Sequence, residues 1–85
     1  MIRLSIQQGA TIQQFDYSTN SKKFLSQLIR LTEKQISTGK LFEGVKTLET
    51  IETKKDINDL QISYNYNLLI NGSDHATVSI QYELI

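Results

Sequence analysis

Residues 60–85 read LQISYNYNLLINGSDHATVSIQYELI, and apolar residues alternate with polar ones through most of this stretch. The apolar residues occupy even positions on both sides of the polar segment 71–75. Alternation with a period of two is typical of a β-strand with one buried face. The stretch therefore predicts two one-sided strands that pair as an antiparallel hairpin.

The register of this hairpin follows from the requirement that its apolar residues share one face. A slip of one residue would move a whole row to the other face, so the loop must contain an odd number of residues. We prefer a five-residue loop over 71–75, which places Ile70 opposite Ala76. A three-residue loop is the alternative. A two-residue Asn71-Gly72 turn would pair even with odd positions and is disfavoured.

Length and composition indicate one small domain over residues 1–85. The chain has a formal net charge of zero and contains neither cysteine nor proline. A neutral chain has no long-range attraction to nucleic acid or to anionic membranes. Without cysteine there can be no disulfide and no thiolate zinc site. No apolar run approaches the ~20 residues of a membrane span, so we expect a cytoplasmic protein with no membrane partner.

A second hairpin is predicted over residues 2–17, where apolar and polar residues again alternate. Gly9-Ala10 suits a type II′ turn, which requires glycine at its first central position. Pairing Gln8 with Thr11 aligns the apolar residues of the two strands on one face. Ile12 is the exception, because it falls on the opposite face.

Residues 22–37 predict the main helix. Residues 18–21 offer several N-caps, and Gly39 suits the C-terminal stop. At about 100° per residue, one side of this helix gathers apolar side chains with Gln35 as the polar exception. The apolar side consists of Phe24, Leu25, Leu28, Ile29, Leu31 and Ile36.

Residues 41–53 admit two interpretations. A helix would group Leu41, Val45 and Leu48, whereas a strand suits the threonine, valine and isoleucine content of the segment. We favour the strand and expect residues 54–59 to form a polar connection. The element order is then ββαβββ, with ββααββ as the alternative. Either order predicts an α+β fold, a single two-layer domain in which an antiparallel sheet of four to five strands packs on one main helix.

No motif in the sequence indicates catalysis. His75 is the single histidine, and we interpret it as a solvated turn residue because a metal site or an acid–base pair needs further groups at fixed geometry. The acidic residues lack the spacing of a calcium loop, and the four glycines form no phosphate-binding pattern. We therefore expect no enzymatic activity, no metal and no cofactor.

The outer faces of the predicted strands are polar but poor in charge. Because the centres of protein interfaces are depleted in charge, such a face is a candidate partner-binding surface. The last strand also ends at Leu84-Ile85 without a polar tail, and an open edge of this kind can accept another strand. In the C-terminal hairpin the candidate residues are Gln61, Ser63, Asn65, Asn67, Leu69, Thr77, Ser79 and Gln81.

The expected function is binding to another protein or to itself as a homodimer or larger homo-oligomer. The high content of isoleucine, asparagine, lysine, glutamine and threonine is typical of an AT-rich bacterial or phage genome. Small size, the lack of a catalytic constellation and the uncharged sheet face with its open edge motivate the narrower hypothesis of a phage or mobile-element inhibitor or assembly factor. The alternative function, which we do not favour, is that of a nucleic-acid-associated factor. It would use a positive stripe on one side of the helix, where cations can grip phosphates, formed by Lys23, Gln27, Arg30 and Lys34.

Overall fold

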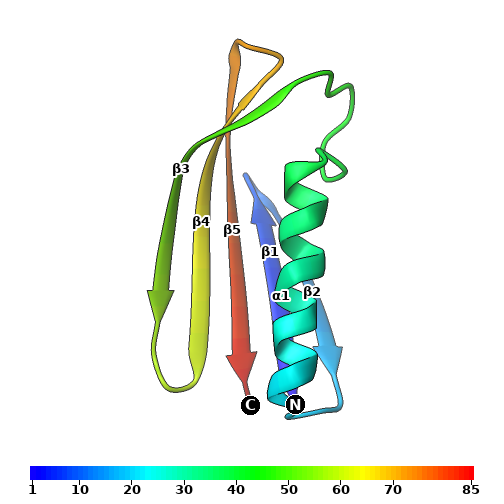
Figure 1. Ribbon diagram of the computed structural model, residues 1–85, viewed down its shortest axis with the longest axis vertical. Helices are drawn as coiled ribbons and strands as arrows, with labels where there is room; N and C mark the ends of the chain where they lie inside the picture. The colour runs from blue at the N-terminus through cyan, green and yellow to red at the C-terminus, as the bar shows by residue number, and fades with distance from the viewer.

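The computed structural model describes residues 1–85 as one helix packed on a five-stranded antiparallel sheet (Figure 1). The predicted ββαβββ order and the α+β class are confirmed. The order of strands across the sheet is β2-β1-β5-β4-β3. The elements are β1 (Ile2–Gln8), β2 (Thr11–Tyr17), α1 (Lys22–Ser37), β3 (Leu48–Ile57), β4 (Gln61–Ile70) and β5 (Asp74–Leu84).

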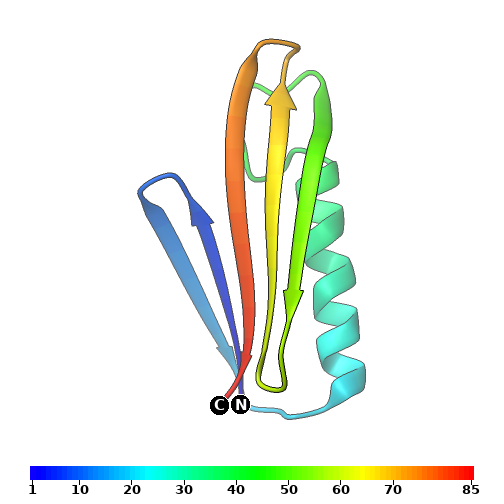
Figure 2. The same ribbon diagram turned by 90° about the vertical axis from the view of Figure 1, so that its left-hand side faces the viewer.

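The C-terminal strand lies in the middle of the sheet. β5 pairs with β4 on one side and with β1 on the other, where Ile2 lies opposite Leu84 and the Ile85 amide donates a 2.8 Å hydrogen bond to the Met1 carbonyl. The prediction of an open edge at the last strand is therefore wrong, because β1 covers it. The edge strands are β2 and β3, at opposite sides of the sheet (Figure 2).

The N-terminal hairpin has the predicted register. Gln8 pairs with Thr11, and the apolar residues of the two strands face the helix side together. Gly9 has a φ of +55° while Ala10 stays at negative φ, as a type II′ turn requires. Ile12 points to the other face and is 60% exposed.

In the C-terminal hairpin even-numbered residues pair with even-numbered residues, as predicted, but the loop is shorter than the preferred one. Ile70 pairs with Asp74, so three residues form the turn and the preferred five-residue loop is wrong. Asn71 and Gly72 both have positive φ, 53° and 75°. Two consecutive left-handed residues reverse the chain within three positions, which leaves Asp74 free to extend the ladder.

The helix begins and ends where its capping residues predict. The Ser21 hydroxyl accepts a hydrogen bond from the Phe24 amide at the N-terminus. At the C-terminus Gly39 has a φ of +71°, and the amides of Gly39 and Lys40 donate to the carbonyls of Ile36 and Gln35. This pair of bonds is a Schellman motif. The helix is amphipathic, and the structure contains no helix with the length and apolar character that crossing a membrane requires.

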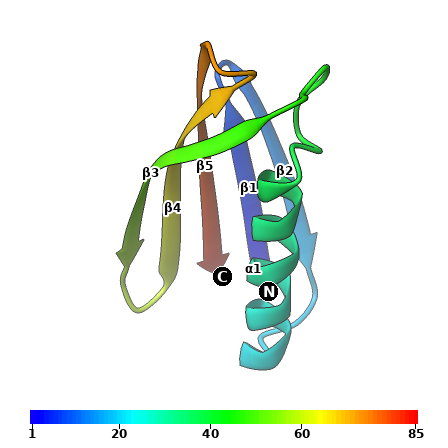
Figure 3. The ribbon, with the colours of Figure 1, turned by 45° about the horizontal axis from the view of Figure 1, so that its top comes forward.

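The strand interpretation of residues 41–53 is confirmed from Leu48 onward, and the helical alternative is wrong. The connection from α1 stays near the C-terminal end of the helix, and the first part of β3 itself crosses to the far edge of the sheet (Figure 3). The expected polar connection over 54–59 is also wrong in its extent, because β3 continues to Ile57 in pairing with β4. An edge strand tolerates charged side chains on both faces, so Lys54 to Asp56 do not end it.

The core lies between α1 and the three central strands. Its eleven buried apolar residues are Ile2, Leu4, Ile6, Leu28, Ile36, Tyr64, Tyr66, Leu68, Val78, Ile80 and Tyr82. The assignment of Leu31 to the buried side of the helix was wrong. Leu31 is 61% exposed because it lies beside β2, where the sheet ends, and Thr32 is buried in its place. The Thr32 hydroxyl donates to the Leu28 carbonyl at 2.8 Å, which satisfies this buried polar group within the helix.

Candidate functional site

The face of the sheet opposite the helix carries a block of uncharged side chains that spans four strands. Two neighbouring rows cross β2, β1, β5 and β4. The first row is Gln14, Ser5, Gln81 and Ser63, and the second is Ile12, Gln7, Ser79 and Asn65. We call these eight residues the neutral face.

Charged residues border the neutral face on two sides. On β3 the two rows continue into Asp56 and Lys54. In the row beside Ser5 and Gln81, on the side of the chain termini, lie Asp16, Arg3 and Glu83. Depletion of charge at the centre is a feature of protein interfaces.

The neutral face is hollowed rather than flat. A depression of about 290 Å³ lies over it, and all eight of its residues line the depression. The Ser5 hydroxyl in the lining is buried and has no hydrogen-bond partner. A buried hydroxyl without a partner costs free energy in the folded chain.

Side-chain hydrogen bonds order the residues around the depression. The Ser79 hydroxyl on β5 donates to Asn65 Oδ1 on β4 at 2.7 Å. Within β4, Gln61 Nε2 donates to the Ser63 hydroxyl at 3.2 Å. Side chains that are already ordered lose less conformational entropy when a partner binds.

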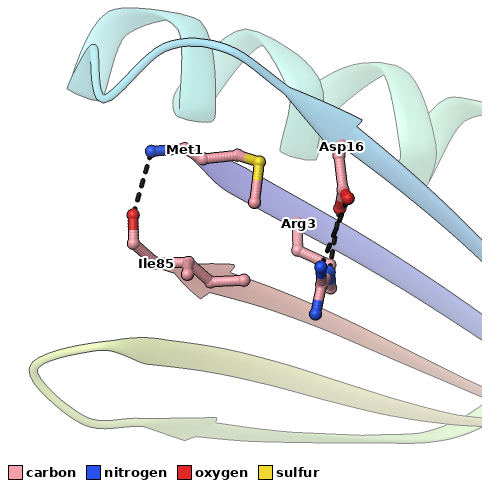
Figure 4. Close-up of polar contacts among 4 residues, drawn as sticks. All are labelled: Met1, Arg3, Asp16 and Ile85. Carbon is pink, nitrogen blue, oxygen red and sulfur yellow. Dashed lines mark hydrogen bonds and ion pairs between the residues drawn. The ribbon is translucent and has the colours of Figure 1, made fainter.

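One ion pair lies beside the neutral face. Arg3 on β1 and Asp16 on β2 point toward one another, with Arg3 Nε 2.8 Å from Asp16 Oδ1 (Figure 4). The hydrogen bond from the guanidinium lowers the pKa of Asp16 below its ordinary value. Figure 4 also shows the first and last residues joined, because the Met1 amino group donates to the Ile85 carbonyl at 3.0 Å.

The predicted partner-binding residues all lie on this outer face, but only half of them line the depression. Ser63, Asn65, Ser79 and Gln81 belong to the neutral face, while Gln61, Asn67, Leu69 and Thr77 flank it on the same two strands. The other half of the neutral face comes from the N-terminal hairpin. Alternation along the sequence places these four residues on an outer surface, but only the pairing of β1 with β5 joins the two hairpins into one surface. The four are Ser5, Gln7, Ile12 and Gln14.

The positive stripe of the helix lies where the sequence predicts. Lys23, Gln27, Arg30 and Lys34 are all exposed on α1, and none of these side chains forms an ion pair. The stripe is confined to one helix, so the structure adds no further element to it. Nucleic-acid contact through the stripe stays a second hypothesis.

The remaining candidate groups do not form a site. His75 lies within β5, exposed and opposite Leu69, rather than in the turn. No group of three or more His, Cys, Asp or Glu side chains gathers in an arrangement that could hold a metal ion. Tyr64, Tyr66 and Tyr82 are buried, as predicted for core residues.

Comparisons of the chain with protein-family models, with curated proteins and with solved structures found no match.

Proposed function

We propose that this protein is a protein-binding module whose neutral face docks onto a partner protein. The observation that carries the proposal is the uncharged surface of two rows across four strands of one sheet. The centres of protein interfaces are depleted in charge, and this surface has charged neighbours on two of its sides only. The narrower form of the proposal is an inhibitor or assembly factor of a phage or mobile element.

The chemistry of the neutral face defines the partner surface that it would fit. Its amide and hydroxyl groups both donate and accept hydrogen bonds, and Ile12 adds one apolar contact at the β2 side. A complementary surface is therefore uncharged at its centre and offers backbone or amide groups.

The test introduces charge into the centre of the face. Asn65→Lys together with Ser79→Lys places two ammonium groups on neighbouring strands, and burying them against a partner would be costly. Both residues lie on the solvent side of the sheet, so we expect the fold to persist. The matched control is Ser18→Lys with Ser73→Lys, which adds the same charge at exposed loop positions.

Each variant, and the unchanged protein, is used as bait in extract of the source cells, and captured proteins are compared quantitatively. We expect a captured protein that is lost with the face variant and retained with the loop variant. Circular dichroism verifies that both variants are folded. Equal capture by the two variants would exclude the neutral face as the interface.

A further inference from the structure

The two edges of the sheet differ in how they are protected. β3 carries five charged residues in ten, and its register with β4 shifts between Thr50 and Glu52. Charged side chains and β-bulges are the devices by which proteins prevent a strand edge from pairing with another chain. The β3 edge is therefore protected against pairing with a strand of another chain.

The β2 edge has none of these devices. Its seven residues include one charge, Asp16, and that carboxylate is already paired with Arg3 at 2.8 Å. The register with β1 is continuous from Tyr17 to Thr11, and every residue of β2 before Tyr17 is exposed. Such an edge can accept a further strand.

The backbone groups that an added strand would meet can be identified. The Ile85 amide donates to the Met1 carbonyl, so odd-numbered residues of the C-terminal strand point their peptide groups toward β1. Because peptide groups alternate in direction along an antiparallel ladder, even-numbered residues of β1 point toward β2. The outward groups of β2 then belong to Ile12, Gln14 and Asp16.

An apolar flank accompanies this edge on the helix side. Phe15 of β2 is 44% exposed and Leu31 of α1 is 61% exposed. Both line a groove of about 270 Å³ between α1 and the β2 side of the sheet, together with Tyr17 and Leu28. A strand added at β2 would cover the exposed parts of Phe15 and Leu31.

We infer that the occupant of this edge is a second copy of the chain, whose β2 pairs antiparallel with β2 across a two-fold axis at Phe15. This register places Phe15 opposite its own counterpart and Gln14 opposite Asp16 of the second copy, so apolar meets apolar and no like charges are opposed. The same patch serves both copies, as a two-fold interface requires. The two sheets would continue into one, with both helices on the same side.

The inference goes beyond the proposed function, because it uses the backbone groups of the β2 edge and the helix side. Ile12 and Gln14 belong to the neutral face as well, but here their outward peptide groups carry the contact rather than their side chains. A contact of one strand and its flank is small for a protein interface. We therefore expect a reversible dimer with a dissociation constant in the micromolar range, about 1–50 µM.

The first experiment measures mass by light scattering over a concentration series. We expect the unchanged protein to shift from 9.7 kDa toward twice that mass. Gln14→Pro removes one outward N–H and should keep the protein monomeric. Thr53→Pro places the same ring at an outward position of the β3 edge and should leave the dimer intact. A protein that stays at 9.7 kDa up to millimolar concentration overturns the inference.

The second experiment locates the two-fold axis by disulfide formation, since the chain contains no cysteine of its own. In the inferred register the two Phe15 Cα atoms lie within disulfide range. Phe15→Cys incubated with oxidised glutathione should form a covalent dimer about tenfold faster than the control Thr53→Cys on the other edge. Equal rates at the two positions would overturn the pairing, whatever the mass measurement shows.

Discussion

The side-chain amide of Asn71 donates a 3.0 Å hydrogen bond to the carbonyl oxygen of Gly44, across 27 positions of sequence. The same side chain accepts bonds from the amides of Lys46 and Thr47, at 2.6 and 3.2 Å. One residue of the β4–β5 turn therefore holds the connection that leads from α1 to β3. Its positive φ of 53° shapes the turn at the same time.

Asn71→Ala should lower the free energy of unfolding by about 1–3 kcal/mol, because it removes these bonds and leaves alanine in a left-handed conformation. Asn71→Gly is the matched comparison, since glycine accepts the positive φ but cannot make the side-chain bonds. Urea denaturation of the unchanged protein, Asn71→Ala and Asn71→Gly separates the contribution of the side-chain hydrogen bonds from that of the left-handed backbone. If Asn71→Gly is as stable as the unchanged protein, the bonds to the connection contribute nothing.

Leu28→Ala should destabilise the protein by about 2–5 kcal/mol, the range found when alanine replaces a core leucine and leaves a cavity. Leu28 is 8% exposed and faces the sheet, whereas Leu31, less than one turn away, is 61% exposed. Leu31→Ala should therefore cost less than about 0.5 kcal/mol in the monomer. Chemical denaturation at low protein concentration measures both. A cost for Leu31→Ala equal to that for Leu28→Ala would mean that the helix is rotated from its position in this structure.

Ser5→Ala should leave the free energy of unfolding unchanged or raise it by up to about 1 kcal/mol, because the buried hydroxyl has no partner to lose. Ser79→Ala is the control, since that hydroxyl donates to Asn65 and its removal should cost about 0.5–1.5 kcal/mol. Thermal and urea unfolding measure the change in stability of Ser5→Ala and of Ser79→Ala relative to the unchanged protein. A clear loss of stability with Ser5→Ala would show that its hydroxyl is already satisfied.

The pH dependence of stability should show the buried tyrosines. Burial raises the pKa of Tyr66 to about 12 and raises the pKa of Tyr82 above its ordinary value. An unfolded tyrosine ionises near pH 10. Above about pH 10 the unfolded chain therefore loses protons that the folded protein keeps, and the free energy of unfolding falls as pH rises toward 12.

Urea denaturation at a series of alkaline pH values measures this fall, and phenolate absorbance follows the ionisation of the tyrosines. Tyr66→Phe should make the fall shallower, because it removes one of the two groups responsible. If all four tyrosines ionise together near pH 10 while the fold persists, the hydroxyls of Tyr66 and Tyr82 are hydrated rather than buried.

Local patterns predicted the elements and their faces well where a short-range signal was present. The Gly9-Ala10 turn fixed the register of the first hairpin, because a two-residue turn leaves one pairing. Ser21 and Gly39 marked the helix ends through capping bonds that involve only neighbouring residues. The length of the C-terminal loop was harder to predict, because pairing even with even residues allows a loop of three or of five residues. Only the left-handed conformation of Asn71 and Gly72 selects three.

The candidate surfaces depended on contacts that no local pattern contains. Alternation placed Ser5 and Ser63 on outer faces, but their rows meet only because β5 lies between β1 and β4. The same strand order moved the open edge from the C-terminal strand to β2 and left Leu31 beside that edge rather than in the core.

By itself the sequence determined the two hairpins, the helix and, apart from Leu31, which side of each is apolar, because those properties depend on the spacing of neighbouring residues and on local backbone bonds. The extent of β3 depended on its pairing with β4, which continues through Lys54 to Asp56. Only the tertiary structure decided which strands are neighbours, which two form the edges, and where the uncharged rows join into one face. The physical reason is that any exposed strand edge offers the same peptide groups for pairing, so the choice among strands depends on how the whole apolar surface is covered at once.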